Sequence, residues 1–244
     1  MCELCTANAS TSRMARRNVL KLVGFAAAGL AIAPRAFAKE TKAPPKPENV
    51  LSPDAALDRL MKGNTRYIDG LTKRHDFKHE REVLSSGQNP FAAVLSCADS
   101  RIAPELCFDT ARGDVFVCRV AGNFANDDIV ASLEYAVAVL NAPLIVVLGH
   151  GACGAVDATI KSIKDGTTLP GHLPSLVAAL RPAVEAVKDK PGDLLANAIR
   201  ANVALTVDKL KGAAPILKSS ADDKKIRVVG GVYELKTGRV ELLS

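Results

Sequence analysis

Short apolar runs alternate with longer amphipathic segments along most of this chain, and the alternation limits the folds it can adopt. Runs compatible with buried strands lie at residues 91–96, 115–120, 144–148 and 226–232, with a shorter run at 240–243. Segments with apolar residues at helical spacing lie between them, at residues 53–67, 128–140, 173–187 and 194–210. Strands that alternate with helices favour parallel pairing. The pattern therefore predicts an α/β domain with a mainly parallel central sheet of four strands plus a short C-terminal edge strand, flanked by helices.

The basic excess of the chain is concentrated at its N-terminus. The net charge is +6, but residues 1–38 contain five lysines or arginines and one glutamate, which leaves +2 for the remainder. That remainder has three tyrosines and no tryptophan, so it lacks the basic face and the aromatic platform of nucleic-acid binders. We therefore expect no nucleic-acid partner.

The first 38 residues have the layout of an export signal. Arg16-Arg17 precedes an apolar stretch, and Ala36-Phe37-Ala38 has the small-x-small pattern of a cleavage site. The adjacent arginines resemble a twin-arginine signal. The alternative is a retained anchor, but about 15 apolar residues at 1.5 Å each span roughly 22 Å, less than the ~30 Å core of a bilayer. We expect cleavage, no stable membrane insertion afterwards, and export to the periplasm by the twin-arginine route.

Three segments follow from this arrangement. Residues 1–38 are predicted to be a signal peptide, and residues 39–51, with three prolines and several charges, a linker. Residues 52–244 are predicted to form the folded domain.

Two short segments with reactive side chains follow predicted strands. Cys97-Ala98-Asp99-Ser100-Arg101 comes directly after the first strand, and Gly149-His150-Gly151-Ala152-Cys153-Gly154 comes directly after the third. The carboxyl ends of parallel strands meet at one edge of a sheet, where ligands bind in such folds. Two thiolates and an imidazole form a Cys₂His set suited to zinc. Cys97, His150 and Cys153 are therefore candidate ligands of one zinc ion per chain.

The glycines of the second segment allow another interpretation. Gly149-x-Gly151-x-x-Gly154 after an apolar strand matches the dinucleotide-binding fingerprint, and would indicate a nucleotide-dependent oxidoreductase. That fingerprint requires an acidic residue at the end of a second strand about 20 positions later. A helical pattern and a turn follow here instead. Zinc accounts for both cysteines and the histidine, so we favour the metal site.

These residues resemble the two signatures of the β-class carbonic anhydrases, Cys-x-Asp-x-Arg at 97–101 and His-x-x-Cys at 150–153. Residues 63–67 and 233–238 also look like segments of that family. The resemblance implies a zinc lyase that reversibly hydrates carbon dioxide to bicarbonate and a proton, by attack of a zinc-bound hydroxide. It implies that Cys97, His150 and Cys153 hold the zinc, and that Asp99 and Arg101 form a catalytic dyad beside it.

The resemblance also implies a substrate pocket and an oligomer. Gln88 matches a glutamine that hydrogen-bonds substrate, and Phe116 and Tyr135 match pocket residues, some of which reach across a dimer interface. The backbone N–H of Gly154, at the start of a helix, is placed to assist bicarbonate binding. A homodimer or a dimer of dimers is the expected assembly.

Asp99 has two mutually exclusive arrangements. As a fourth metal ligand it would close the site and make it structural, whereas paired with Arg101 it leaves one coordination position open. Family members that favour the closed state use a second bicarbonate site containing a tryptophan, and this chain has no tryptophan. We therefore predict the open form.

The remaining histidines and cysteines carry weaker signals. His75 and His79 lie in a mixed charge run and are predicted to be solvated, and His172 is predicted to be a structural loop residue. A disulfide between Cys107 and Cys118 is conceivable in an oxidising compartment, but the sequence does not determine it.

Overall fold

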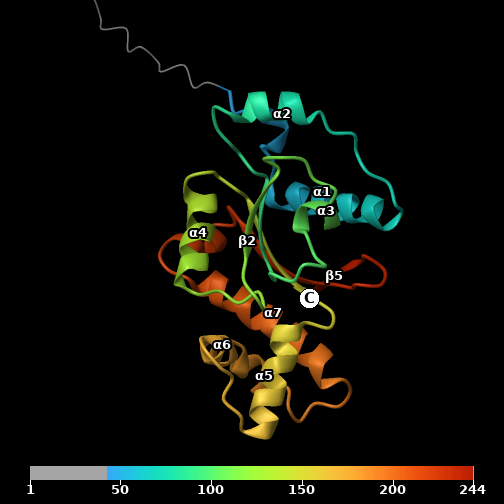
Figure 1. Ribbon diagram of the computed structural model, residues 1–244. Coiled ribbons are helices and arrows are strands. Elements are labelled where there is room, and N and C mark those ends of the chain that lie inside the picture. Colours follow the sequence, from blue (N-terminus) through green and yellow to red (C-terminus); the bar gives the residue numbers. More distant parts are fainter. Residues whose placement is uncertain (1–42, 244) are drawn as a thin grey trace, which may run out of the picture. The chain divides into compact units, whose positions relative to one another are not determined.

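Residues 43–243 are described by the computed structural model of this chain, and they build a five-stranded sheet with helices on both faces (Figure 1). The strands lie in the spatial order β2-β1-β3-β4-β5, with bounds β1 Ala92–Ser96, β2 Val115–Arg119, β3 Leu144–His150, β4 Arg227–Tyr233 and β5 Val240–Leu243. β1 to β4 pair in parallel, and only β5 is antiparallel. This confirms the predicted fold class, including the short edge strand at the C-terminus.

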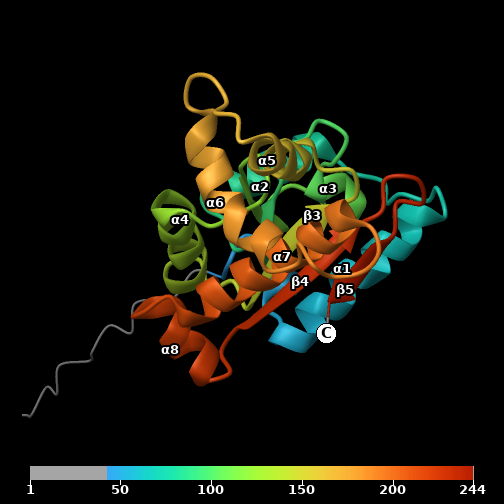
Figure 2. The ribbon, with the colours of Figure 1, turned by 90° about the horizontal axis from the view of Figure 1, so that it is seen from below.

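The helices form two layers around this sheet (Figure 2). Their bounds are α1 Pro53–Ile68, α2 Phe77–Leu84, α3 Pro104–Cys107, α4 Asp127–Ala138, α5 Gly154–Asp165, α6 Leu173–Glu185, α7 Leu194–Gly212 and α8 Ile216–Asp222. α1 and α3 share an apolar core with one face, while α4, α7 and α8 pack on the other. α5 and α6 form a further cluster with α7. Within residues 43–243 no helix is both long and apolar enough to span a bilayer.

The central strands are buried because helices cover both of their faces. Every residue of β1 and β3 is buried, whereas β2 is partly exposed because it forms one edge of the sheet. Parallel strands covered on both faces are expected to be continuously apolar, as most of β1 and most of β3 are. The register pairs Ser96 with Leu148, so the segments that follow β1 and end β3 emerge side by side.

Local signals set where the helices begin. Ser52 caps α1 by accepting a hydrogen bond from the Ala55 amide, and Pro53 occupies the first helical position, where no N–H is needed. Asn126 caps α4 in the same way through the Ile129 amide. The observed starts of α1 and α4 lie within one residue of those that apolar spacing predicts.

The N-terminal residues that the structure describes are tied to the domain. Lys46 and Asn89 exchange two hydrogen bonds, at 3.0 and 2.7 Å, and Lys46 pairs with the Asp114 carboxylate. Asn49, at the end of a 3-10 turn, is buried against the same carboxylate. The stretch predicted to be a linker is thus bound to the domain at Lys46 and Asn49. Residues 39–42 and the predicted signal peptide lie outside the described residues.

Candidate metal centre

The loops after β1 and β3 bring Cys97, His150 and Cys153 together. Cys97 follows the last residue of β1, His150 ends β3, and Cys153 directly precedes α5. One ligand atom from each side chain, either Sγ or an imidazole nitrogen, lies within 4.8 Å of the other two, and all three residues are buried. The side chains predicted to be ligands therefore form one cluster.

The His150 imidazole is oriented for metal binding. Its Nδ1 lies 2.9 Å from the Gly151 carbonyl oxygen, so a proton on Nδ1 satisfies that contact and leaves the lone pair on Nε2. Nε2 is buried and has no hydrogen-bond partner among the described residues. Such an orphaned polar atom costs about 1–3 kcal/mol unless something occupies it. Together with two thiols, this nitrogen fits the tetrahedral Cys₂His chemistry of zinc.

The two thiols share negative charge unequally. Hydrogen bonds from Cys153 and from the Gly122 and Asp99 amides lower the pKa of Cys97 despite its burial. The hydrogen bond to the Cys97 sulfur, together with burial, raises the pKa of Cys153. Within the cluster, negative charge is therefore favoured on the Cys97 sulfur over the Cys153 sulfur.

Asp99 lies beside the cluster but is held by Arg101. The guanidinium donates from Nε to Oδ1 at 2.9 Å and from Nη2 to Oδ2 at 2.7 Å, and the Arg101 amide donates to Oδ1 at 2.9 Å. These bonds hold the pKa of Asp99 well below its usual range, so the group is a carboxylate. Asp99 Oδ2 is still 3.8 Å from His150 Nε2. Arg101 also donates to the Ala152 carbonyl at 3.2 Å and so links the two loops.

A further arginine, which sequence reasoning missed, clamps the first loop. Arg119, at the end of β2, donates to the carbonyl oxygens of Cys97 at 3.0 Å, Asp99 at 2.7 Å and Ile102 at 2.9 Å. The register places Arg119 opposite Ser96, so it lies at the same edge of the sheet as the candidate ligands. The position of Arg119 near the end of the strand predicted at 115–120 was the sequence signal that could have placed it beside the candidate ligands.

Comparison with known proteins agrees with this geometry. A sequence model of the family described as "Carbonic anhydrase" matches residues 92–240. The chain belongs to the carbonic anhydrase family. Carbonic anhydrase 2 of Mycobacterium tuberculosis is 36% identical over 192 residues, which cover 78% of this chain and 93% of that protein. The carbonic anhydrase of Mycolicibacterium smegmatis is 37% identical over 195 residues, covering 79% and 94%.

The fold identifies the β class. A tetrameric β-carbonic anhydrase of Sordaria macrospora superposes with a TM-score of 0.62 at 25% identity, covering 78% of this chain and 98% of that one. As a β-class carbonic anhydrase the chain catalyses carbon dioxide hydration, and zinc is its cofactor. The dinucleotide interpretation of the glycines is therefore set aside.

The predicted substrate residues of this carbonic anhydrase do not all lie near the metal cluster within one chain. Gly154 begins α5 next to Cys153, and the space beside its Cα is open. Gln88 is exposed and precedes β1, so it lies at the opposite end of the strand from Cys97. Phe116 is in contact with Tyr135, with ring centroids 6.3 Å apart, three residues before Arg119 on β2. At ~3.3 Å per residue this places Phe116 about 10 Å along the strand from Arg119.

The other cysteines and histidines lie outside the metal cluster. Cys107 packs with α1 on one face of the sheet and Cys118 with α4 on the other, and both are free thiols. The sheet between them rules out the disulfide that the sequence left open. His75 is in contact with Glu80 at 3.2 Å rather than being freely solvated, and His172 immediately precedes α6.

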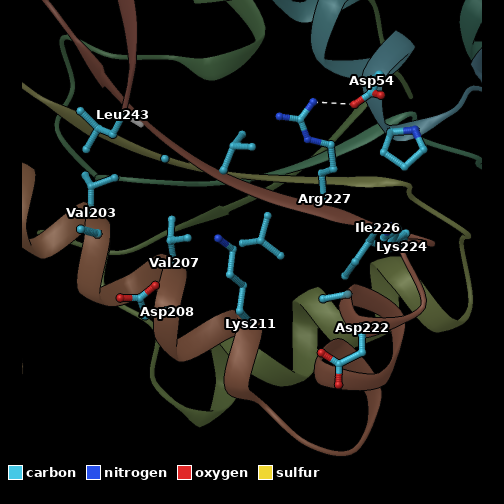
Figure 3. Close-up of a pocket in the computed structure, with 16 residues that line it drawn as sticks. Asp54, Val203, Val207, Asp208, Lys211, Asp222, Lys224, Ile226, Arg227 and Leu243 are labelled. Carbon is cyan, nitrogen blue, oxygen red and sulfur yellow. Dashed lines mark hydrogen bonds and ion pairs between the residues drawn. The ribbon is translucent and has the colours of Figure 1, made fainter.

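A large cavity of this carbonic anhydrase, about 900 Å³, is remote from the loops after β1 and β3 that carry Cys97, His150 and Cys153. It lies between α7, α8 and the beginning of β4, with an ion pair between Arg227 and Asp54 at its rim (Figure 3). His150 pairs with Tyr233 at the other end of β4. The cavity therefore does not mark the reaction site.

Proposed function

We propose that Cys97, His150 and Cys153 hold one zinc ion per chain and that Asp99 and Arg101 act beside it as the catalytic dyad. The observation that carries this assignment is the convergence of three buried ligand atoms within 4.8 Å, with His150 Nε2 lacking any partner among the described residues. The zinc, when bound, acts as a Lewis acid that makes hydroxide available from water near neutral pH.

The dyad orients the attacking group. Asp99, kept ionised by Arg101, accepts a hydrogen bond at Oδ2 from the hydroxyl that attacks carbon dioxide. The bidentate contact fixes the carboxylate plane, so the hydroxyl presents its lone pair to the substrate carbon. The Gly154 amide, in the first turn of α5, stabilises the negative charge of bicarbonate.

We propose the open arrangement as the resting state at neutral pH. To become a metal ligand, Asp99 would give up two hydrogen bonds from the Arg101 guanidinium and one from its amide. The chain has no tryptophan for a second bicarbonate site of the kind that favours closure. A crystal structure of the zinc-loaded protein near pH 8 with Asp99 on the metal would contradict this.

The test of the assignment is stopped-flow carbon dioxide hydration between pH 7 and 9, with zinc measured on the same samples. Cys97→Ser should remove most of the zinc and the activity. Cys107→Ser is a matched control, because Cys107 is also a buried thiol but lies outside the metal cluster. The assignment fails if Cys97→Ser keeps full zinc and full activity, or if the two variants behave alike.

We propose that the protein is a homodimer, or a dimer of dimers, joined along the β2 edge of the sheet. β2 has no further strand on its outer side within the described residues, and beside it Tyr135 of α4 and Val139, which follows α4, are 47% and 57% exposed. An interface there would let Gln88, Phe116 and Tyr135 approach the partner's metal centre. Val139→Glu should convert the assembly to monomers in sedimentation experiments and reduce activity, whereas Leu205→Glu, on exposed α7 surface, should do neither.

We propose that residues 1–38 direct export by the twin-arginine route and are then removed. The sequence Arg16-Arg17, the apolar stretch and Ala36-Phe37-Ala38 support this. Mass spectrometry of the periplasmic protein should give an N-terminus at Lys39. Replacing both Arg16 and Arg17 by Lys should hold the precursor in the cytoplasm, while the control Arg13→Lys should be exported normally.

A further inference from the structure

The turn between β2 and α4 touches the metal cluster through its backbone. The Gly122 amide donates a hydrogen bond to Cys97 Sγ at 3.2 Å, and the contact is buried. Gly122 and the next residue, Asn123, both have positive φ, at 84° and 41°. A β carbon at Gly122 would lie 2.8 Å from the Leu180 side chain, and the positive φ would strain any residue with a side chain, so both favour glycine there. The turn has an unusual backbone shape that other parts of the fold must hold.

Helix α7 holds this turn from outside with two side chains. Asn202 Nδ2 donates to the Gly122 carbonyl oxygen at 2.7 Å, and Lys209 Nζ donates to the Ala125 carbonyl oxygen at 2.6 Å. The two residues are seven positions apart and so lie on the same face of the helix. Asn202 is only 3% exposed, so water does not readily replace its bond to Gly122.

A hydrogen bond to a metal-binding thiolate changes the positive charge that remains on the metal. Two thiolates formally cancel the charge of a zinc ion, which weakens its action as a Lewis acid. An N–H donor on the sulfur withdraws charge from the thiolate and leaves more positive charge on the metal. The Gly122 amide is placed to do this for Cys97, provided that the turn keeps its shape.

We infer that Asn202 is a positioning residue of the metal centre, which fixes Gly122 so that its amide stays hydrogen-bonded to the Cys97 sulfur. The inference rests on the proposed zinc site. It assigns a role at the metal to a helix 80 residues along the chain from the turn. Asn202 itself touches neither the ligands nor the substrate.

The test compares Asn202→Leu with Lys209→Met, a matched control that also removes a side-chain bond from α7 to this loop. Zinc release to an excess of a chromophoric chelator should be about 10-fold faster in Asn202→Leu than in the wild type. This is the lower end of the loss in metal affinity that follows removal of groups supporting the ligands. The sulfur-to-cobalt charge-transfer band of the cobalt-substituted Asn202→Leu protein should shift. Lys209→Met should keep the wild-type release rate and band.

A measurement on the wild type keeps the inference testable if Asn202→Leu does not fold. In the cadmium-substituted protein, NMR should detect scalar coupling between the metal and the Gly122 amide proton, transmitted through the hydrogen bond to sulfur. Absence of that coupling overturns the inference. Equal acceleration of zinc release in both variants also overturns it, because loop anchoring in general would then explain the effect.

The outcome is separable from that of the proposed function. Release rates, cobalt spectra and cadmium coupling depend on the metal centre and not on turnover. A wild type that holds zinc as described but does not hydrate carbon dioxide would contradict the proposed function and leave the role of Asn202 standing.

Discussion

At the scale of single residues, Asp99 is held ready as a hydrogen-bond acceptor by three donors from Arg101. Asn in its place offers one acceptor oxygen and can present its NH₂ group to the attacking hydroxyl instead. We expect Asp99→Asn to retain about one zinc per chain and to lose roughly 100-fold in hydration rate, the lower end of the usual effect of a proton-handling group. Stopped-flow assays with metal analysis check this. Asp222→Asn, an exposed change, is the control, and an unchanged rate in Asp99→Asn would remove the dyad from the mechanism.

Arg119 has a different effect, because it holds backbone rather than a carboxylate. Arg119→Gln cannot bond all three carbonyls of the loop from Cys97 to Ile102 at once. We expect faster amide hydrogen exchange in that loop and a kcat lower by up to about 100-fold, the loss that a 1 Å misplacement of reacting groups can cause. Arg200→Gln, which breaks an exposed ion pair with Glu241, should change neither quantity. If amide hydrogen exchange in this loop is as slow in Arg119→Gln as in the wild type, the loop is rigid without the Arg119 hydrogen bonds.

The sequence was sufficient to find the three residues that cluster as candidate ligands, but not the residues that support them. Cys97 lies one position past an apolar strand and His150 and Cys153 lie in one short segment, so strand ends and spacing reveal them. Asn202 contacts Gly122 across 80 residues from an ordinary helical pattern, and nothing local distinguishes it from a surface asparagine. Long-range contacts of this kind depend on how helices pack, which residue patterns do not specify.

At the scale of elements, α1 packs closely against the end of α3. A β carbon added to Gly63 would overlap the carbonyl oxygen of Phe108, which is backbone and cannot rotate away. We expect Gly63→Ala to lower the free energy of unfolding by about 3 kcal/mol, as overpacking in a dense core does. Urea denaturation measures this. Gly212→Ala, at the end of α7 with open space beside it, should be neutral or slightly stabilising, and equal effects in both variants would refute the close approach.

The loop that follows α3 is tied to α1 by a pH-dependent contact. Burial raises the pKa of Asp109, but hydrogen bonds from Arg66, Thr72 and the Lys73 amide outweigh it, so the pKa lies below its usual range. A carboxyl with a lowered pKa in the folded state stabilises the protein above its unfolded pKa of about 3.9 and loses that contribution as the pH falls. The stability difference between wild type and Asp109→Asn should therefore be full above about pH 5 and shrink below it.

Denaturation series from pH 3 to 7 test the Asp109 contact. Asp54→Asn serves as the control, because Asp54 forms an exposed ion pair with Arg227 and should have little effect at any pH. A stability difference for Asp109→Asn that does not change with pH would mean that the carboxylate charge is not what stabilises the fold.

The long helices followed from residue patterns, and the short helices did not. α4 and α7 carry apolar stripes over several turns, and these stripes indicate helix wherever they face a sheet. α2 has no buried residue and α3 is only four residues long, so neither has a stripe to detect. Their positions depend on capping and on neighbouring loops.

At the scale of the whole molecule, the zinc proposed at Cys97, His150 and Cys153 would tie together two loops that the sheet only brings close. Zinc at this cluster would bind the folded chain and not the separated ligands of an unfolded one, so it should stabilise the fold by mass action. Zinc at a thousand times its Kd contributes about 4 kcal/mol, which corresponds to roughly 10 °C in Tm for a chain of this size. Scanning calorimetry of zinc-loaded and chelated protein checks this. Zinc should not raise the Tm of the Cys97→Ser control. If zinc does not raise the Tm of the wild type either, the cluster is not a zinc site.

The architecture as a class was predictable, but its spatial order was not. Alternating strands and helices indicate a parallel sheet, yet β2 lies at the edge and β1 between β2 and β3. That order depends on which helix covers which face, through contacts such as those of α4 with β1 and β2. Apolar patterns mark a segment as buried without saying what lies next to it.

The attachment of Lys46 and Asn49 has a practical consequence for handling the protein. Both residues are bound to Asn89 and Asp114, just before β1 and β2, whereas the metal loops follow the far ends of the parallel strands. A bead or electrode linked through a tether that ends near residue 43 would therefore attach to each chain at the end of the sheet opposite that chain's own candidate zinc ligands.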